Sequence, residues 1–453
     1  MAAQSLARTA RRLTCLTGQL YRGLWLRQLP HGLVSLRYLL PGQDDRVCRH
    51  AELWRQSRGR TPLLIWLLAE LWLWFRWVTI SGWLSCLRVM RHRGDWYYKR
   101  HGISQWRQWR TLVRLSIGCC VPPIDVYRFS LFRNPDRVWN YVFDHEIHAY
   151  HRRRNGHRGS GKASRELLAD KYRHAEVLAE TGIPTAPILA CVSGNSRQPI
   201  SEWLTPKMRL FCKTRSGNCG FGAFTAWRTD DIIQGRKLSG EHLPDAEAVN
   251  RAWLELLNLD DALVQPALLN HPQLAPLAVG DDAITVRYIT RREGTVCDCL
   301  NASLEVPAGH DEHGRPLYVI LPIEPETGVL RSFPQELIRD GGAAERQAAV
   351  VSRIAPNQAV PDWPVIAAGS RRAHQTVSDL WAVAWDWVVT PDGVCLLEGN
   401  SGWGAAIPQM LQGGFLQGDE ACPVTADAGD PVFPCHTPVI PNTRRTSRVR
   451  SVS

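Results

Sequence analysis

The chain has 453 residues, of which 44% are apolar and 21% are charged, so it can bury a sizeable core and is not a globally disordered protein. Its net charge of +11 is uneven, because residues 1–168 hold 29 Lys and Arg against 10 Asp and Glu. This N-terminal third therefore carries +19 and the remainder carries −8. A face this basic is expected to contact phosphates, in anionic lipid headgroups or in nucleic acid.

Cysteine usage indicates a reducing compartment, because the 13 cysteines are odd in number and include no Cys-x-x-Cys pair. The first 30 residues contain five arginines and no continuous apolar segment, unlike a signal peptide. We therefore expect a cytoplasmic protein, with the inner face of the membrane as an additional location. No specific contact with nucleic acid is expected.

An apolar, Trp-rich segment covers residues 62–80, with the sequence PLLIWLLAELWLWFRWVTI. Its 19 residues could cross a bilayer, but Glu70 and Arg76 interrupt it. Three interpretations stay open: a buried helix of the N-terminal domain, a helix lying on the membrane surface, and a membrane span. Tryptophan favours the boundary between water and lipid, so peripheral membrane contact is among our expectations.

Residues 141–162 are polar and rich in turn formers, which indicates a domain boundary near residue 163. We predict a basic, Trp-rich domain over residues 1–163, a second domain over 164–420 and a flexible tail over 421–453. A helix is expected to begin at Ser164 and to stop before Gly182. Further helices are expected at 246–257 and 373–379, and strands at 188–192, 209–213, 262–266, 284–290, 382–389 and 394–398. This mixture predicts an α+β fold with mostly antiparallel sheets.

The most informative stretch reads as a β-hairpin around the turn Pro391-Asp392-Gly393. Asp386 and Glu398 lie at matching distances on either side of this turn, and strand alternation places Glu398 and Asn400 on one face. Two carboxylates and an amide oxygen are hard ligands that suit Mg²⁺. A hairpin with ordinary surface acids is the equally weighted alternative.

Two lysines accompany this hairpin. Lys213 ends a predicted strand and is followed by Gly217, Gly220 and Gly222, a composition that lets backbone N–H groups approach phosphate oxygens. Lys171 follows Asp170 on the predicted helix. Taken singly, the first could be a plain loop and the second a solvated helix lysine.

Taken together and in this order, four segments resemble the ATP-grasp superfamily, in particular its branch associated with sugar transfer and cell-surface polysaccharides, which includes α-L-glutamate ligase-like proteins. The segments are DKYRHAEVLAETGIPTAP, LFCKTRSGNCGFGAF, LVQPALLNHPQL with ITVRYIT, and WDWVVTPDGVCLLEGNSGW. The resemblance covers residues 164–415 and implies two α+β subdomains that grip ATP, preceded by a mainly helical N-terminal domain.

The resemblance also implies roles for individual residues. The nucleotide would be held by Lys171, Lys213, the lid glycines Gly217, Gly220 and Gly222, and the adenine hinge of residues 264–268 with Gln265 and Leu268. The metal, Mg²⁺ or Mn²⁺, would be held by Asp386, Glu398 and Asn400. Arg287 and Lys213 would act on the reacting phosphate. Departures are Thr214 where many relatives have proline, Gln265 where glutamate is common, and no obvious acid for the ribose, with Asp281 and Asp282 as candidates.

Three functions follow as hypotheses. The first is a ligase that activates a small-molecule carboxylate as an acyl phosphate and joins it to an amine or sugar acceptor, releasing ADP and phosphate. The second is a kinase of the same fold in which an alcohol attacks ATP. The third is a non-catalytic basic module that binds anionic lipid or nucleic acid.

Two histidine-containing segments are interpreted differently. His145-Glu146-Ile147-His148 is one residue short of the zinc-protease spacing and is predicted to be part of a polar connector. His374 is expected either on a helix surface or in contact with the substrate.

Overall fold

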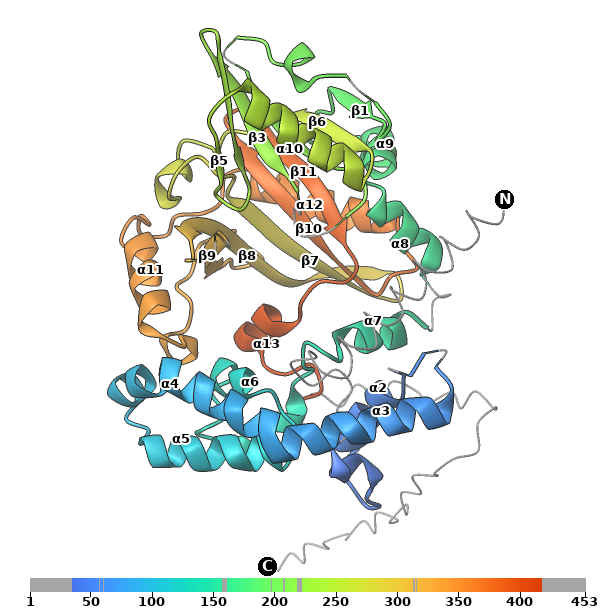
Figure 1. Ribbon diagram of the computed structural model, residues 1–453, viewed down its shortest axis with the longest axis vertical. Helices are drawn as coiled ribbons and strands as arrows, with labels where there is room; N and C mark the ends of the chain where they lie inside the picture. Colours follow the sequence, from blue (N-terminus) through green and yellow to red (C-terminus); the bar gives the residue numbers. More distant parts are fainter. Residues whose placement is uncertain are drawn as a thin grey trace, which may run out of the picture.

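The structure is a computed structural model that describes residues 35–417, except for residues 57, 60, 157–160, 197, 207, 218–221, 313 and 315. The predicted tail, residues 421–453, lies outside the described residues. The chain forms a helical N-terminal region followed by two antiparallel sheets with helices packed on them (Figure 1). The predicted α+β class and the predicted helical N-terminal region are both confirmed.

The N-terminal region is built from helices and short helical turns. They are η2 (Leu36–Leu39), α2 (Asp45–Gln56), α3 (Leu63–Arg76), the π-helical turn η3 (Trp77–Ser81), α4 (Gly82–His101), α5 (Gln105–Leu112), the π-helical turn η4 (Val113–Ile117), α6 (Pro123–Arg128), η5 (Pro135–Asn140) and α7 (Ile147–Asn155). Three of them, α3, η3 and α4, form one continuous helix, Leu63–His101, which lies across one end of the molecule (Figure 1). By length and composition this helix could cross a membrane.

One face of this long helix is buried against the rest of the N-terminal region. Trp66, Glu70, Leu73 and Trp77 follow one another at spacings of four, three and four residues and are all buried. The next inward residue is Gly82, five positions after Trp77, because the π-helical turn between them inserts one extra residue. The turn thus keeps the same face buried along both halves of the helix.

The first sheet has the strand order β1-β6-β2-β3-β4-β5. Its strands are β1 (Ala190–Val192), β2 (Arg209–Thr214), β3 (Phe224–Thr229), β4 (Ile232–Lys237), β5 (His242–Leu243) and β6 (Ala262–Pro266). Helix α10 (Ala246–Leu259) covers it, with Trp253 and Leu256 packed on Leu210 and Ala226. The hydrophobic side of the sheet is therefore closed by one helix.

The second sheet has the strand order β11-β10-β7-β8-β9. Its strands are β7 (Thr285–Glu293), β8 (Val296–His310), β9 (Pro316–Pro322), β10 (Ala382–Thr390) and β11 (Gly393–Asn400). Helix α12 (Trp363–Gln375) packs on it through Ile366 and Ala373, and Trp385 and Trp387 of β10 lie in the same core. Helices α8 (Lys162–Ala169), α9 (Lys171–Glu180), α11 (Gly341–Val351) and α13 (Ala406–Gln412) complete the described elements together with η7 (Ile200–Glu202), η8 (Ala275–Leu277) and η9 (Gln335–Leu337).

Helix α13 joins the N-terminal helices to the second sheet. The side chain of Gln409 is buried, accepts a hydrogen bond from the backbone N–H of Val142 at 2.8 Å and donates one to the Val142 carbonyl at 2.7 Å. Met410 lies in the core of the N-terminal region. Because the backbone groups of Val142 are satisfied by Gln409, the N-terminal region and the sheets are held in one arrangement.

Three expectations about local structure are wrong. The helix expected from Ser164 is two helices, because Asp170 adopts extended dihedrals and caps α9 by accepting from the N–H of Arg173. The polar connector expected at 141–162 contains helix α7 and buries Glu146, whose carboxylate contacts the ring of His50 at 2.8 Å. The surface position expected as one alternative for His374 is wrong, because its ring is buried and bonds Thr290 at 2.7 Å.

Candidate functional site

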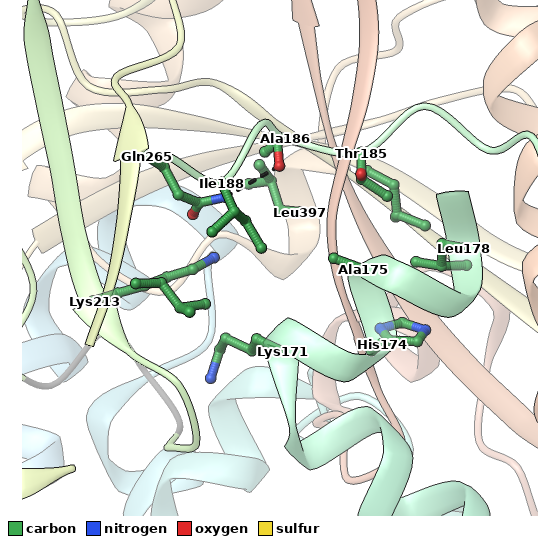
Figure 2. Close-up of a pocket in the computed structure, with 12 residues that line it drawn as sticks. Lys171, His174, Ala175, Leu178, Thr185, Ala186, Ile188, Lys213, Gln265 and Leu397 are labelled. Atoms are coloured by element: carbon green, nitrogen blue, oxygen red, sulfur yellow. Dashed lines mark hydrogen bonds between the residues drawn. The ribbon is translucent and has the colours of Figure 1, made fainter. Parts of the chain in front are cut away.

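The two lysines singled out by the sequence come from different elements and line the same pocket. Lys171 is the first residue of α9, and Lys213 lies near the end of β2. The backbone N–H of Lys171 donates to the carbonyl of Arg215 at 3.1 Å, which fixes the start of the helix against the end of the strand. Figure 2 shows the Lys213 amine directed into the pocket, between Gln265 and Lys171. The structure therefore places two cations at one opening.

The pocket lies where the chain crosses from one sheet to the other. The segment after α9 bonds β11 through Ala186 and Leu396, at 3.2 Å, and then bonds β6 through Leu189 and Val264, at 2.8 Å. About 280 Å³ at this opening is free of protein atoms, and part of that volume is open solvent. The walls are formed by Lys171, His174, Ala175, Leu178, Thr185, Ala186, Ile188, Lys213, Leu263, Gln265, Leu396 and Leu397 (Figure 2). Mostly apolar walls with a few polar groups are typical of a small-molecule site.

The predicted adenine hinge is only partly at this pocket. Gln265 lines it, and its buried side-chain amide donates to the carbonyls of Ala186 and Pro187 at 3.3 and 3.2 Å. Leu268 does not line the pocket. Neither do the two candidate acids for the ribose, since Asp281 pairs with Arg209 and Asp282 pairs with Arg236.

The acidic hairpin is formed by β10 and β11, with Asp386 and Glu398 as direct cross-strand partners. A bulge follows this pair, between Asp386 and Trp387. The side-chain amide of Asn400 donates to Asp386 at 3.0 Å and to Glu398 at 3.2 Å. All three predicted metal ligands therefore lie on one face of the hairpin, as strand alternation requires for Glu398 and Asn400.

The hairpin and the lysines meet at Glu398, whose carboxylate lies 3.9 Å from the Nζ of Lys171. Lys213 lies in the same electrostatic neighbourhood. Burial lowers its pKa to about 8, the attraction of Glu398 opposes this change, and the repulsion of Lys171 adds to it. Cations from the first sheet and from α9 thus face carboxylates from the second sheet.

Arg287 of β7 is tied to this acidic set. Its guanidinium donates to both carboxylate oxygens of Asp386, at 2.9 and 3.0 Å, and pairs with Glu305 of β8 at 2.8 Å. Burial acts to lower the pKa of Arg287, but the charges of Asp386 and Glu305 raise it overall, so Arg287 is a permanent cation. Its planar fork also orients Asp386 towards Glu398.

The donor chemistry of the hairpin fits Mg²⁺. Across the described residues, no group of three or more His, Cys, Asp and Glu side chains is arranged to hold a metal ion. Asn400 would supply the third oxygen, with its amide turned so that the oxygen, in place of the nitrogen that now donates, faces the two carboxylates. Burial raises the pKa of Asp386, and the neighbouring Glu398 raises it further against the opposing effect of Arg287. A divalent cation with oxygen ligands would favour the ionised form of Asp386 at this position.

The glycine-rich loop is described at its two ends. Gly217 has a φ of +133°, which favours glycine, and a Cβ at this position would lie 2.7 Å from the hydroxyl of Thr214. Its carbonyl accepts a hydrogen bond from the Lys171 ammonium. Gly222 begins the return into β3, and Gly220 lies outside the described residues. The first glycine of the predicted lid is therefore in contact with one of the two lysines.

Two further features were not foreseen. Asp170 accepts two hydrogen bonds from Arg215, at 2.9 and 2.7 Å, and this pair connects the residue before Lys171 with the loop after Lys213. His174 lines the pocket wall, and burial lowers its pKa to about 4, so the ring is neutral at pH 7. An Asp-Lys dipeptide followed by a distant Lys-x-Arg is too general a signal for the Asp170–Arg215 pair to be found from sequence.

Comparisons with known proteins identify no family. No family model matches the chain, and no curated protein matches it. Similar solved structures include a D-alanine–D-alanine ligase from Bacillus anthracis, at 12% identity and a TM-score of 0.33 over 55% of this chain. A second is the biotin carboxylase domain of 2-oxoglutarate carboxylase from Hydrogenobacter thermophilus in complex with MgADP, at 13% identity and a TM-score of 0.32 over 54% of this chain. A third is D-alanyl-alanine synthetase A from Vibrio cholerae, at 12% identity and a TM-score of 0.30 over 51% of this chain.

The matched regions span 64%, 42% and 54% of those three proteins. Similarity of this extent does not establish a family.

Proposed function

We propose that this protein is an ATP- and Mg²⁺-dependent ligase of the ATP-grasp type, which activates a carboxylate as an acyl phosphate and transfers the acyl group to an amine or another nucleophile. The observation that carries the proposal is that Lys171 and Lys213 line one pocket between the two sheets and meet the acidic set beside it, where Glu398 lies 3.9 Å from the Nζ of Lys171. Asp386, Glu398 and Asn400 adjoin this pocket and do not line it. A plain surface hairpin would not bury Asp386 or face two lysines from other elements.

Each group of side chains at the site has a separate role in phosphoryl transfer. The apolar walls with Ile188 and Gln265 receive the base, while Lys171 and Lys213 bind the phosphates. Asp386, Glu398 and Asn400 would hold Mg²⁺, which supplies charge neutralisation at the transferred phosphoryl group.

Arg287 keeps the Asp386 carboxylate oriented and adds a fixed positive charge beside the reacting oxygens. The attacking carboxylate forms a bond to the γ-phosphorus as the bond to ADP breaks, and the acceptor then displaces phosphate. Positioning and charge compensation by these side chains are what such a transfer requires.

The resemblance of the four sequence segments supports a role on a cell-surface sugar or its precursor, as the second part of this proposal. A kinase of the same fold is the alternative chemistry, and oxygen-18 separates the two. Label in the substrate carboxylate passes into inorganic phosphate in the ligase and stays in the substrate in the kinase.

The proposal is tested by ADP release from the full-length protein in the presence of Mg²⁺, a panel of carboxylates, and amines or aminosugars. Carboxylate-dependent ADP formation is expected to fall about 100-fold or more in Lys213→Met and Glu398→Gln. Lys162→Met and Glu247→Gln are matched controls, because these side chains are 75% and 86% exposed and lie outside the pocket. Unchanged turnover in both site variants would refute the assignment.

A further inference from the structure

The long helix Leu63–His101 has an apolar outward face that the fold leaves uncovered. Its large side chains are exposed over 41% to 69% of their surface, with 69% for Leu64, 61% for Ile80 and 41% for Leu87. We call this face the outer stripe, formed by Leu64, Leu68, Leu71, Phe75, Ile80, Leu84 and Leu87. Exposed apolar patches of this kind mark interaction sites.

The outer stripe is straight because of the π-helical turn. Its residues follow at spacings of four, three, four, five, four and three, and the five-residue step from Phe75 to Ile80 spans the turn Trp77–Ser81. The buried face shows the same five-residue step, from Trp77 to Gly82. One inserted residue therefore keeps the inward and outward faces opposite each other over about 35 Å of helix.

The inward face excludes a membrane-spanning arrangement of this helix in the folded protein. Trp66 packs on Trp54 with ring centroids 4.5 Å apart, and Trp54 donates to the buried carboxylate of Glu70 at 3.3 Å. Further along, Trp77 donates to the Ser116 carbonyl at 2.6 Å. These contacts attach the helix lengthwise to the other N-terminal helices, so only its outward face can meet lipid.

Charge distinguishes a lipid surface from a second protein copy. The helix Leu63–His101 holds two acidic residues: Glu70, which lies on the inward face, and Asp95 near its C-terminal end, which is exposed and pairs with Lys99. Arg88 and Arg91 are exposed, and Arg91 continues the spacing of the stripe. A second copy packed antiparallel would place these arginines against leucines, without a carboxylate to pair with. In an anionic bilayer, headgroup phosphates can pair with the arginines while acyl chains contact the apolar side chains of the stripe.

We propose that the outer stripe docks on the surface of an anionic bilayer, with the helix in the plane of the membrane, its apolar side chains below the headgroups and Arg88 and Arg91 among the phosphates. The local charge of +19 over residues 1–168 adds long-range attraction to such a surface. This inference stands on the N-terminal helices and is independent of the chemistry proposed for the pocket.

The test is sedimentation of the full-length protein with vesicles of phosphatidylcholine alone, or of equal parts phosphatidylcholine and phosphatidylglycerol, at low and high ionic strength. Binding is expected to be stronger to the anionic vesicles and to weaken with salt. The double variant Leu68→Asp/Phe75→Asp should lower the partition coefficient about 100-fold or more. Arg88→Gln/Arg91→Gln should lower it about 20-fold on anionic vesicles and little on phosphatidylcholine.

Two controls make the outcome decisive. Ile232→Asp and Val296→Asp also charge exposed apolar side chains, at 57% and 55% exposure, but on the sheets, and should leave binding unchanged. Leu64→Gln, the mildest change at the most exposed position of the stripe, provides a second variant if the double variant does not fold, and should lower binding several-fold.

Two results would overturn the proposal. The first is that anionic vesicles bind the wild type no better than the stripe variants, or bind neither. The second is a wild-type dimer, detected by light scattering, that the double variant Leu68→Asp/Phe75→Asp dissociates.

Discussion

Replacing Lys213 by methionine should stabilise the empty protein while weakening nucleotide binding. Burial lowers the pKa of this ammonium from 10.5 to about 8, which corresponds to about 3 kcal/mol of unfavourable free energy for keeping the charge at neutral pH. Methionine has a similar length and no charge. Because the side chain is only partly buried and solvent screens part of this term, we expect a gain of about 1–2 kcal/mol in the free energy of unfolding.

The same substitution has a defined pH dependence. Folded Lys213 binds its proton less tightly than unfolded Lys213, so the free energy of unfolding of the wild type rises with pH between about 8 and 10.5. The stability advantage of Lys213→Met is therefore fully present below about pH 8 and shrinks as the pH rises above this value. Thermal unfolding followed at about pH 7 and about pH 9.5 measures both the gain and its loss, with an expected rise in Tm of about 1–2 °C at the lower pH for a chain of 453 residues.

Nucleotide provides the second readout of this experiment. Mg-ATP should raise the Tm of the wild type and leave that of Lys213→Met almost unchanged, because losing a charged contact to phosphate weakens binding about 10- to 100-fold. Lys162→Met serves as the control and should alter neither quantity. A destabilised Lys213→Met, an advantage that grows with pH, or an undiminished response to Mg-ATP would each refute the reasoning.

Three further substitutions test the parts of the site separately. Glu398→Gln should abolish the Mg²⁺ dependence of nucleotide binding measured by calorimetry, with unfolding little affected, whereas retained Mg²⁺ dependence would exclude it as a ligand. Asp170→Ala removes the cap of α9 and the carboxylate that accepts two hydrogen bonds from Arg215, which keeps its longer ion pair with Asp261. We expect a loss of about 1–3 kcal/mol in the free energy of unfolding, measured by chemical denaturation, and a KM for ATP raised more than kcat is lowered. An unchanged KM would argue against coupling of the two lysines. Gly217→Ala forces a side chain into a φ of +133° and against Thr214, and should raise the KM for ATP several-fold; wild-type kinetics would show that the loop is not part of the site.

Local patterns predicted the strands that carry the site well. Strand β6 has the predicted bounds, Ala262–Pro266, and the turn Pro391-Asp392-Gly393 joins β10 and β11, with Gly393 at a φ of +122°. Turn chemistry and short apolar runs are local signals, so they can be recognised without the rest of the fold. The position of the turn predicts that Asp386 pairs with Glu398 across the two strands. It does not predict the bulge between Asp386 and Trp387.

Features that depend on tertiary partners were missed. Helix α9 begins at Lys171 because Asp170 is held by Arg215, which lies 45 residues away. Helix α12 ends at Gln375, where a helix over 373–379 was predicted, since the segment after it turns to bring Leu380 into the core of the second sheet. Strands β3, β4, β8 and β9 carry weak alternation and depend on their neighbours in the sheet.

For residues 62–80, composition alone does not determine which faces of the helix are buried. The apolar content of this segment was compatible with a buried helix, a surface helix or a span. In the structure the helix buries Trp66 and Trp77 on one side and leaves Leu64 and Leu68 exposed on the other. Sequence periodicity was obscured here, since apolar residues occupy both faces and the π-helical turn shifts the register midway.

An experimental structure of the full-length protein with a non-hydrolysable ATP analogue and Mn²⁺, located by its anomalous signal, would test most directly whether the two lysines and the acidic hairpin form one nucleotide site. The account predicts a manganese peak bound by Asp386, Glu398 and Asn400, with the phosphates between it and the amines of Lys171 and Lys213. A nucleotide bound elsewhere, or a metal that none of these three side chains contacts, would contradict it.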